Sequence, residues 1–211
     1  MKVKQRYIID FAKGITWILV IYLIFLFDQK ENLTAWIYFC LHGSYGLMWV
    51  AKSYIFPDKT WESKVGIPYA SLIFIGLLLY WAPALIITST GHEASLPATV
   101  IAIFTFIIGV FYHFVSDMQK HIFLKNNSGL ITDGFWKQCR HPNYFGELLI
   151  YSSFAILVAE TSLWWFPLSV LFLFIVAVWI PNMILIDKSL SRFDEHKSYK
   201  DKTAFLIPFI L

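Results

Sequence analysis

Charged side chains are scarce in this sequence of 211 residues, because Asp, Glu, Lys and Arg together make up only 15% of it. Soluble domains carry about 25% charged residues, so the scarcity argues against a soluble globular enzyme. In their place, 58% of the residues are hydrophobic and 19% are aromatic. The apolar residues also come in long runs, and the composition therefore indicates an integral membrane protein.

Cysteine and histidine are scarce as well. Cys40 lies in an apolar run and Cys139 in a polar segment, so the two cysteines form neither a disulfide framework nor a pair of metal ligands. The 6 histidines are scattered along the chain and cannot supply the histidine-rich ligand sets of membrane di-iron enzymes. The spacing of His113, Asp117 and His121 would allow a metal ion to bind, but we expect none.

Six apolar runs are long enough to be considered as transmembrane helices, which need about 20 mostly apolar residues each. They cover approximately residues 11–27, 33–56, 67–88, 96–115, 144–159 and 163–186. Basic residues precede the first run, as in a signal peptide, but Asp10 and Lys13 interrupt it, so we interpret it as a retained span in which these two residues pair. The sequence predicts an all-α, polytopic membrane bundle that forms one domain over residues 1–211.

The basic residues are distributed unevenly between the two sides of the membrane. With six spans, the N-terminus, the loops at 57–66 and 116–143 and the C-terminal tail share one side. Of the 17 Lys and Arg residues, all but Lys30 fall on that side or near it. The positive-inside rule therefore predicts that both termini are cytoplasmic. Setting this topology is a sufficient role for most of these residues.

Four ionisable residues follow one another at four-residue intervals at the end of the fourth run. They are His113, Asp117, His121 and Lys125, and the spacing places them on one face of a helix. This stripe is either a solvated interfacial face or one wall of a polar cavity. In the second interpretation, Asp117 orients cations or a ribose.

A second polar set lies in the run at 33–56. His42, Tyr45, Trp49 and Lys52 also follow helical spacing. Tyr45 or His42 could donate a proton to a bound lipid. Alternatively, His42 is a hydrogen-bonded packing residue and Lys52 extends to the cytoplasmic interface.

The segment 129–147 is the richest in candidate site residues. Pro142 can begin a helix, and the neighbouring Asn143 offers amide groups. Gly146 permits the close approach of a ligand or of another helix. Glu147 lies about one turn into the fifth run, where an ionisable group is costly and therefore predicts a site, unless a structural ion pair neutralises it.

Three motifs stand in the C-terminal half: Arg140-His-Pro-Asn-Tyr-Phe-Gly-Glu147, Ser189-Leu-Ser-Arg-Phe193 and Tyr199-Lys-Asp-Lys-Thr-Ala-Phe-Leu-Ile-Pro208. In them the chain resembles the membrane superfamily of steroid 5α-reductases, sterol reductases and isoprenylcysteine carboxyl methyltransferases, and within it a bacterial and plant reductase-like group. The resemblance is specific over about residues 113–211, which implies that this half binds the cofactor.

The superfamily implies one of two cofactors. Its reductases use NADPH to saturate an activated carbon–carbon double bond, whereas its methyltransferases transfer a methyl group from S-adenosylmethionine to a lipid. The methyltransferases usually lack an acid after the glycine of the Arg-His-Pro motif, and a pair of glutamates follows their last span. This chain has Glu147 after Gly146 and reads Ile186-Asp-Lys-Ser-Leu190, so the resemblance favours an oxidoreductase that acts on CH–CH groups.

The resemblance also implies the residues of the site. A cofactor would be bound by Asp117, Lys125, Arg140, His141, Asn143, Tyr144, Gly146, Glu147, Arg192 and Tyr199. Asn143, Gly146 and Glu147 would meet the nicotinamide and ribose, and the cations would neutralise the phosphates. The expected catalytic residues are Tyr45, His42 and Glu147.

Three functions stay open: an NADPH-dependent reductase of a lipid or steroid-like enone, a lipid methyltransferase that uses S-adenosylmethionine, and a non-catalytic membrane protein or carrier. A polar site at the membrane entrance favours an enzyme. We expect a lipid-like substrate from the bilayer and no nucleic-acid partner. A multi-pass protein of this kind would reside in the inner membrane of a bacterium or in the endoplasmic reticulum of a eukaryote.

Overall fold

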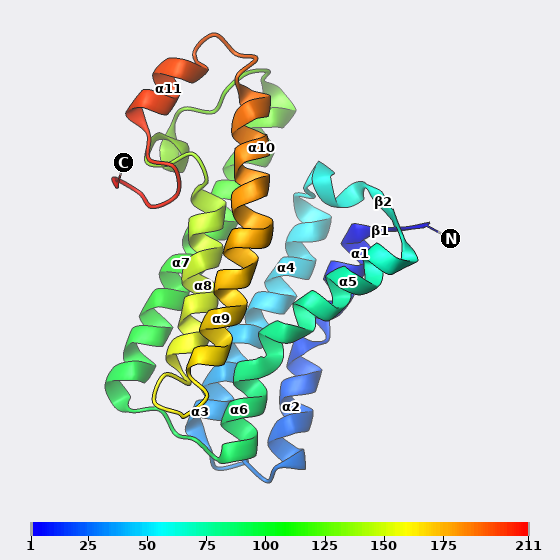
Figure 1. The fold of residues 1–211 in the computed structure, drawn as a ribbon, viewed down its shortest axis with the longest axis vertical. Coiled ribbons are helices and arrows are strands. Elements are labelled where there is room, and N and C mark those ends of the chain that lie inside the picture. The colour runs from blue at the N-terminus through cyan, green and yellow to red at the C-terminus, as the bar shows by residue number, and fades with distance from the viewer. Residues whose placement is uncertain (1, 211) are drawn as a thin grey trace. The chain divides into compact units, whose positions relative to one another are not determined.

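A computed structural model describes residues 2–210, most of which are helical (Figure 1). The α-helices are α1 (Gln5–Gly14), α2 (Thr16–Leu26), α3 (Leu33–Tyr38), α4 (Ser44–Ile55), α5 (Ile67–Leu78), α6 (Ala82–Thr90), α7 (Leu96–Asn126), α8 (Pro142–Ile156), α9 (Trp165–Phe174), α10 (Ile180–Leu190) and α11 (His196–Lys202). Short 3-10 turns lie at Lys59–Glu62, Leu79–Trp81 and Gly134–Lys137. The predicted all-α fold class is confirmed, and α8 begins at Pro142 as expected.

Two wider π-helical turns interrupt the regular helices. Phe39–Gly43 joins α3 to α4, and Ile175–Trp179 joins α9 to α10. The second turn comes just before Pro181, which has no backbone N–H and whose ring clashes with the carbonyl four residues earlier in a regular helix. Widening the preceding turn accommodates this residue, and the chain stays helical through it.

Four helical stretches are long and apolar enough to cross a membrane: Gln5–Leu26, Ile67–Thr90, Leu96–Asn126 and Trp165–Leu190. Large side chains on them are exposed, among them Leu72, Phe104 and Phe172. Apolar surface of this extent is expected where helices face lipid. The chain is therefore an integral membrane protein.

The other two predicted spans are helical but differ from these four. Helix α8 has 15 residues, and at about 1.5 Å per residue it is shorter than the roughly 30 Å thick hydrocarbon core. The run at 33–56 includes a π-turn and several polar side chains. Six crossings and two cytoplasmic termini stay predictions.

A small two-stranded antiparallel sheet was not predicted from the sequence. Strand β1 (Lys2–Lys4) pairs antiparallel with β2 (Lys64–Gly66), and Val3 lies opposite Val65. Strands of three residues give too short an alternation of apolar and polar side chains to be recognised. The sheet ties the N-terminal segment to the loop that follows α4.

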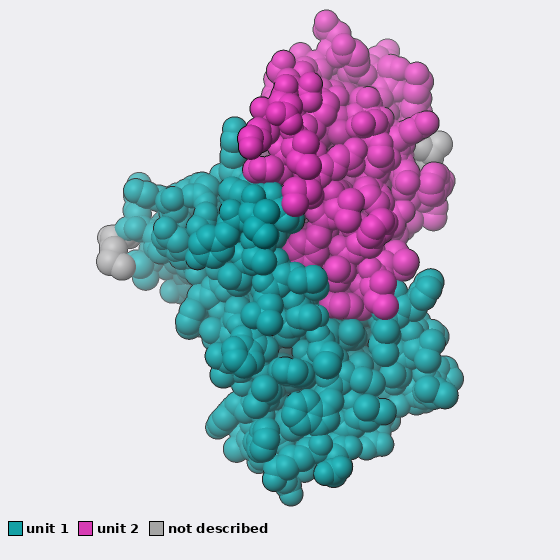
Figure 2. Space-filling view, turned by 180° about the vertical axis from the view of Figure 1, so that it is seen from behind, with its two compact units in different colours: residues 1–104, 151–170 teal, residues 105–150, 171–211 magenta. Residues whose placement is uncertain are grey.

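The chain forms two compact units, which are coloured separately in Figure 2. Unit 1 consists of residues 1–104 and 151–170, and unit 2 consists of residues 105–150 and 171–211. The single membrane domain and the cofactor-binding half at 113–211 stay predictions.

In unit 1, α1 packs against α4 and α5. The contact with α4 is close at Gly46, where a Cβ atom would overlap the backbone of Lys13. The core of the unit contains fully buried Ile24, Tyr38, Tyr45, Ile87, Leu157 and Val158. Because Gly46 carries no side chain, Lys13 can approach the buried face of α4.

In unit 2, α7 and α8 cross at two glycines. A Cβ atom on Gly109 would lie 2.8 Å from the carbonyl oxygen of Gly146, and one on Gly146 would overlap the backbone nitrogen of His113. Gly146 could have served the approach of a ligand or of a helix, and the structure shows that it serves a helix. Burial of Ile150 and Met183 completes this part of the core.

Candidate functional site

The candidate catalytic residues His42 and Tyr45 are buried in unit 1. The hydroxyl oxygen of Tyr38 lies 2.6 Å from Nδ1 of His42, and the hydroxyl donates to the Tyr80 carbonyl at 3.1 Å. The His42 ring stacks on Phe154, with ring centroids 4.4 Å apart. These contacts are those of a hydrogen-bonded packing residue, and the catalytic assignment of His42 stays a prediction.

A buried lysine lies beside Tyr45. Nζ of Lys13 donates to the hydroxyl oxygen of Tyr45 at 2.7 Å and to that of Tyr151 at 3.3 Å. The same ammonium lies 3.6 Å from the centroid of the Trp49 ring, in cation–π geometry. We refer to Lys13, Tyr45, Trp49 and Tyr151 as the Lys13 cluster. The sequence indicated that Tyr45 and Trp49 share a helix face, but not that a cation is buried against them.

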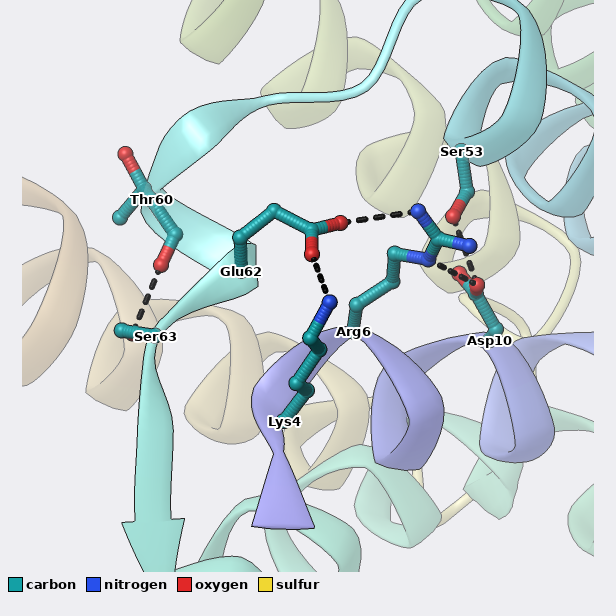
Figure 3. Close-up of polar contacts among 7 residues, drawn as sticks. All are labelled: Lys4, Arg6, Asp10, Ser53, Thr60, Glu62 and Ser63. Atoms are coloured by element: carbon teal, nitrogen blue, oxygen red, sulfur yellow. Dashed lines mark hydrogen bonds and ion pairs between the residues drawn. The ribbon is translucent and has the colours of Figure 1, made fainter.

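Asp10 pairs with Arg6 and not, as expected, with Lys13. Its Oδ2 atom accepts a hydrogen bond from the Ser53 hydroxyl at 2.6 Å and lies 3.7 Å from Nε of Arg6. Figure 3 shows that Arg6 also reaches Glu62, to which it donates at 2.8 Å. Arg6 lies one helical turn before Asp10 on α1, a favourable spacing for an ion pair, whereas the Lys13 ammonium is bound by aromatic residues.

The loop after α4 completes this network. Nζ of Lys4 donates to Glu62 at 2.6 Å. Hydrogen bonding to Lys4 and Arg6 lowers the pKa of Glu62 below its usual value. A small pocket opens beside the network and is lined by Arg6, Ile9, Asp10, Trp49, Lys52, Ser53, Pro57, Asp58 and Trp61. Lys52 is buried there, 4.6 Å from the Trp49 ring centroid, and its extension to the interface stays a prediction.

In unit 2, the stripe predicted on α7 passes from buried to exposed. His113 and Asp117 are buried, His121 is half-buried and Lys125 is exposed. Nδ1 of His113 lies 3.0 Å from the carbonyl oxygen of Asn143, which joins α7 to the first turn of α8. The helical placement of the stripe is confirmed, and its role in binding a cofactor stays a prediction.

Arg140 anchors the C-terminal tail. Its Nε atom lies 3.1 Å from Oδ2 of Asp187, and its Nη1 atom donates to the carbonyls of Lys200 at 3.1 Å and Thr203 at 2.7 Å. Its backbone N–H donates to the carbonyl of Ala204 at 2.9 Å. The guanidinium group therefore neutralises a buried carboxylate and caps the end of α11. We call these five residues the tail anchor.

His141 lies next to the tail anchor and is almost completely buried. Its Nε2 atom lies 3.7 Å from Oδ1 of Asp187, and within residues 2–210 neither of these buried atoms has a hydrogen-bond partner. Burial lowers the pKa of His141 to about 4, although Asp187 acts in the opposite direction. Buried polar atoms normally have partners, so each of these two atoms is suited to a hydrogen bond with a water molecule or a polar ligand atom.

Tyr199 reinforces the same arrangement. Its hydroxyl donates to the carbonyl of Trp136 at 2.7 Å, and its own carbonyl accepts from the hydroxyl of Thr203 at 2.7 Å. Burial raises the pKa of Tyr199 above its ordinary value and raises that of the nearby Cys139 to about 11. Tyr199 thus fixes the turn at Gly134–Lys137 to α11.

The other predicted site residues have more open positions. Tyr144 and Glu147 are half-buried on α8, and the Tyr144 ring meets that of Trp179 edge-on, with centroids 6.0 Å apart. Arg192 is exposed, and its Nη1 atom donates to the carbonyl of Ser189 at 2.9 Å. The exposed cations on unit 2 can reach a charged ligand without breaking a buried contact.

Two residues that organise these clusters were missed in the sequence. Asp187 carried a usable signal, since it is an ionisable residue at the end of an apolar run. No sequence pattern indicated a site role for Tyr151, because a tyrosine in an apolar helix can serve packing as well as hydrogen bonding. The structure brings Arg140, His141 and Tyr199 together in unit 2, whereas Tyr45 and His42 lie in unit 1.

Comparison with known proteins gives two matches. The family model described as "Protein of unknown function (DUF1295)" matches residues 1–203. A Delta(14)-sterol reductase of Arabidopsis thaliana is 32% identical over 77 residues, which cover 30% of this chain and 21% of the relative. The similarity therefore spans about a fifth of that reductase. The two matches confirm the resemblance to the superfamily that contains the sterol reductases.

Proposed function

Because the chain belongs to the DUF1295 family, and because part of it is similar to a sterol reductase, we propose that it is a membrane-embedded reductase. Its reaction would be the NADPH-dependent saturation of an activated carbon–carbon double bond in a lipid or steroid-like substrate. The likeness to the sterol reductase carries the proposal. Glu147 directly after Gly146 supports it, because the related methyltransferases usually lack an acid at that place.

The residues of unit 2 fit a dinucleotide cofactor in part. Lys125 and Arg192 are exposed cations, suited to the phosphates that such a cofactor carries. Nε2 of His141 and Oδ1 of Asp187 are buried polar atoms without hydrogen-bond partners in residues 2–210, suited to a hydroxyl or amide group. Arg140 would contribute mainly by holding the tail. When bound, NADPH supplies a hydride.

Saturation of the double bond also requires a proton, and Tyr45 is the proposed donor. Its hydroxyl oxygen is already held by Nζ of Lys13 at 2.7 Å, so the phenol has a fixed position. A positioned acid of this kind contributes about 10²- to 10⁴-fold to the rate of proton transfer. The substrate would arrive from the bilayer, which the apolar helix surfaces face.

A ligand titration tests this function. Purified protein in detergent is heated in the presence of NADPH or of S-adenosylmethionine, and we expect only NADPH to raise the melting temperature, because a ligand bound by the folded state alone stabilises that state. Stabilisation by S-adenosylmethionine alone would assign the chain to the methyltransferases. Stabilisation by neither would indicate a non-catalytic protein. Glu147→Gln should weaken the NADPH effect.

A further inference from the structure

The Lys13 cluster buries a cation among aromatic side chains within unit 1. Lys13 is 6% exposed, and Tyr45, Trp49 and Tyr151 are each buried to a similar degree or more. Removing an ammonium group from water costs several kcal/mol unless other contacts compensate for it. Here two phenol oxygens and an indole face surround it. The ammonium is therefore placed to act on the two phenol oxygens to which it donates.

The direction of the hydrogen bonds shows what the charge can do. A lysine ammonium has only donors, so the oxygens of Tyr45 and Tyr151 accept from Lys13. The hydroxyl proton of Tyr45 is therefore not directed at the ammonium. Once that proton leaves, the negative charge on the Tyr45 oxygen lies 2.7 Å from a positive nitrogen.

We propose that Lys13 is a positioning residue that holds Tyr45 and stabilises the charge left on its oxygen after it protonates the substrate. This inference rests on the proposed reductase function. In the step, the O–H bond of Tyr45 breaks and a C–H bond forms at the carbon next to the substrate's activating group. The electron pair stays on the phenol oxygen. An N–H proton of Lys13 then restores the hydroxyl, and the neutral amine regains its proton from water.

Unit 1 offers a matched control for this role. Lys52 is also a buried lysine on the Trp49 ring, with Nζ 4.6 Å from the ring centroid, compared with 3.6 Å for Lys13. It lines the pocket together with Asp10, and Tyr45 is not among the residues of that lining. Replacing Lys52 thus removes a buried charge from the same indole while the hydrogen bond from Lys13 to Tyr45 remains.

The first test is a titration of the full-length protein in detergent, followed by the ultraviolet absorbance of tyrosinate. The step that disappears in Tyr45→Phe belongs to Tyr45. In Lys13→Met we expect that step to occur about one to three pH units higher, because an opposite charge within about 4–6 Å favours the ionised form by that amount. Lys52→Met should leave it in place. Lys13→Gln keeps a hydrogen-bond donor without the charge, and serves if Lys13→Met does not fold.

The second test uses cholest-4-en-3-one as an enone probe and follows the consumption of NADPH. We expect Lys13→Met to lower kcat by roughly tenfold or more with little change in KM, which is less than the loss expected when the acid itself is removed. Lys13→Arg, which keeps the charge, should recover part of kcat. A purely structural lysine would not produce this division between kcat and KM.

The outcomes separate the two proposals. Three results of the titration would overturn the role of Lys13. The wild type could show no step that belongs to Tyr45, Lys13→Met and Lys13→Gln could both leave the pH of that step unchanged, or Lys52→Met could shift it by as much as they do. If the wild type neither binds NADPH nor reduces the probe, the reductase function fails, and with it the catalytic use of the cluster. The titration alone then decides whether Lys13 stabilises the Tyr45 anion.

Discussion

Nε of Arg140 lies 3.1 Å from Oδ2 of Asp187, although 47 residues separate them in the chain. This contact joins the segment before α8 to the last turns of α10. The same guanidinium binds two carbonyls at the end of α11. A motif arginine that the resemblance assigned to a cofactor phosphate therefore organises the protein around the proposed site.

Replacing Arg140 should destabilise unit 2. Arg140→Met leaves Asp187 as an unpaired buried carboxylate, and loss of one partner of a buried pair costs about 3–5 kcal/mol. Chemical denaturation in detergent would measure the change in the free energy of unfolding. The double variant with Asp187→Leu should recover much of the loss. Arg192→Met, at an exposed site, should have little effect, and an equally stable Arg140→Met would contradict the anchor.

The crossing of α7 and α8 should not tolerate a side chain. Gly146→Ala places a Cβ atom against the backbone of His113, and Gly109→Ala places one 2.8 Å from the Gly146 carbonyl oxygen. Overpacking usually costs about 1–3 kcal/mol, and backbone atoms cannot move aside. Melting temperatures should fall for both. In Gly66→Ala the new Cβ atom lies 3.8 Å from Pro68, so its melting temperature should stay close to that of the wild type.

Stability should depend on pH through His141. Burial lowers the pKa of His141 from 6.5 to about 4, so between these values the unfolded chain binds more protons than the folded one. Stability is therefore fully present above pH 6.5 and falls as the pH decreases towards 4, by a total on the order of 3 kcal/mol. In His141→Phe the melting temperature should vary less across this range, whereas His121→Phe should retain the slope. A wild-type slope of the opposite sign would refute the prediction.

Neutralising the exposed cations of unit 2 should weaken NADPH binding and leave folding intact. Lys125→Met and Arg192→Met should each raise the Kd by roughly two- to fivefold, the range expected for one exposed charge pair. Added salt should reduce the difference between each variant and the wild type. Lys197→Met, at another exposed lysine, is the control. Of the three variants, only this one should bind NADPH with the Kd of the wild type.

Sequence patterns predicted the helices well where a pattern repeats over many residues. The stripe from His113 to Lys125 lies on one helix as its spacing required, and Pro142 begins α8. The sheet of β1 and β2 was not predicted because three residues do not establish a period. The π-turns were not predicted because they change the helical period for a single turn only.

The partners of the polar residues were harder to predict. Lys13 and Tyr151 meet although they are 138 residues apart, and no local pattern encodes such a pairing. Asp10 had two cations at helical spacing, and spacing alone could not decide between Arg6 and Lys13. Burial separates the two cations. Lys13 contacts phenol and indole groups in the core, whereas Arg6 lies near the acidic residues of the loop.

The π-turn at Phe39–Gly43 fixes the rotational phase of everything that follows it in α4. A π-turn accommodates one more residue than an α-turn, and one residue corresponds to about 100° of rotation around a helix. Deleting a single residue there would turn Tyr45 away from Lys13 and bring a neighbouring side chain in its place. The hydrogen bond between the proposed acid and its cation thus depends on the residue count of the π-turn that precedes the acid.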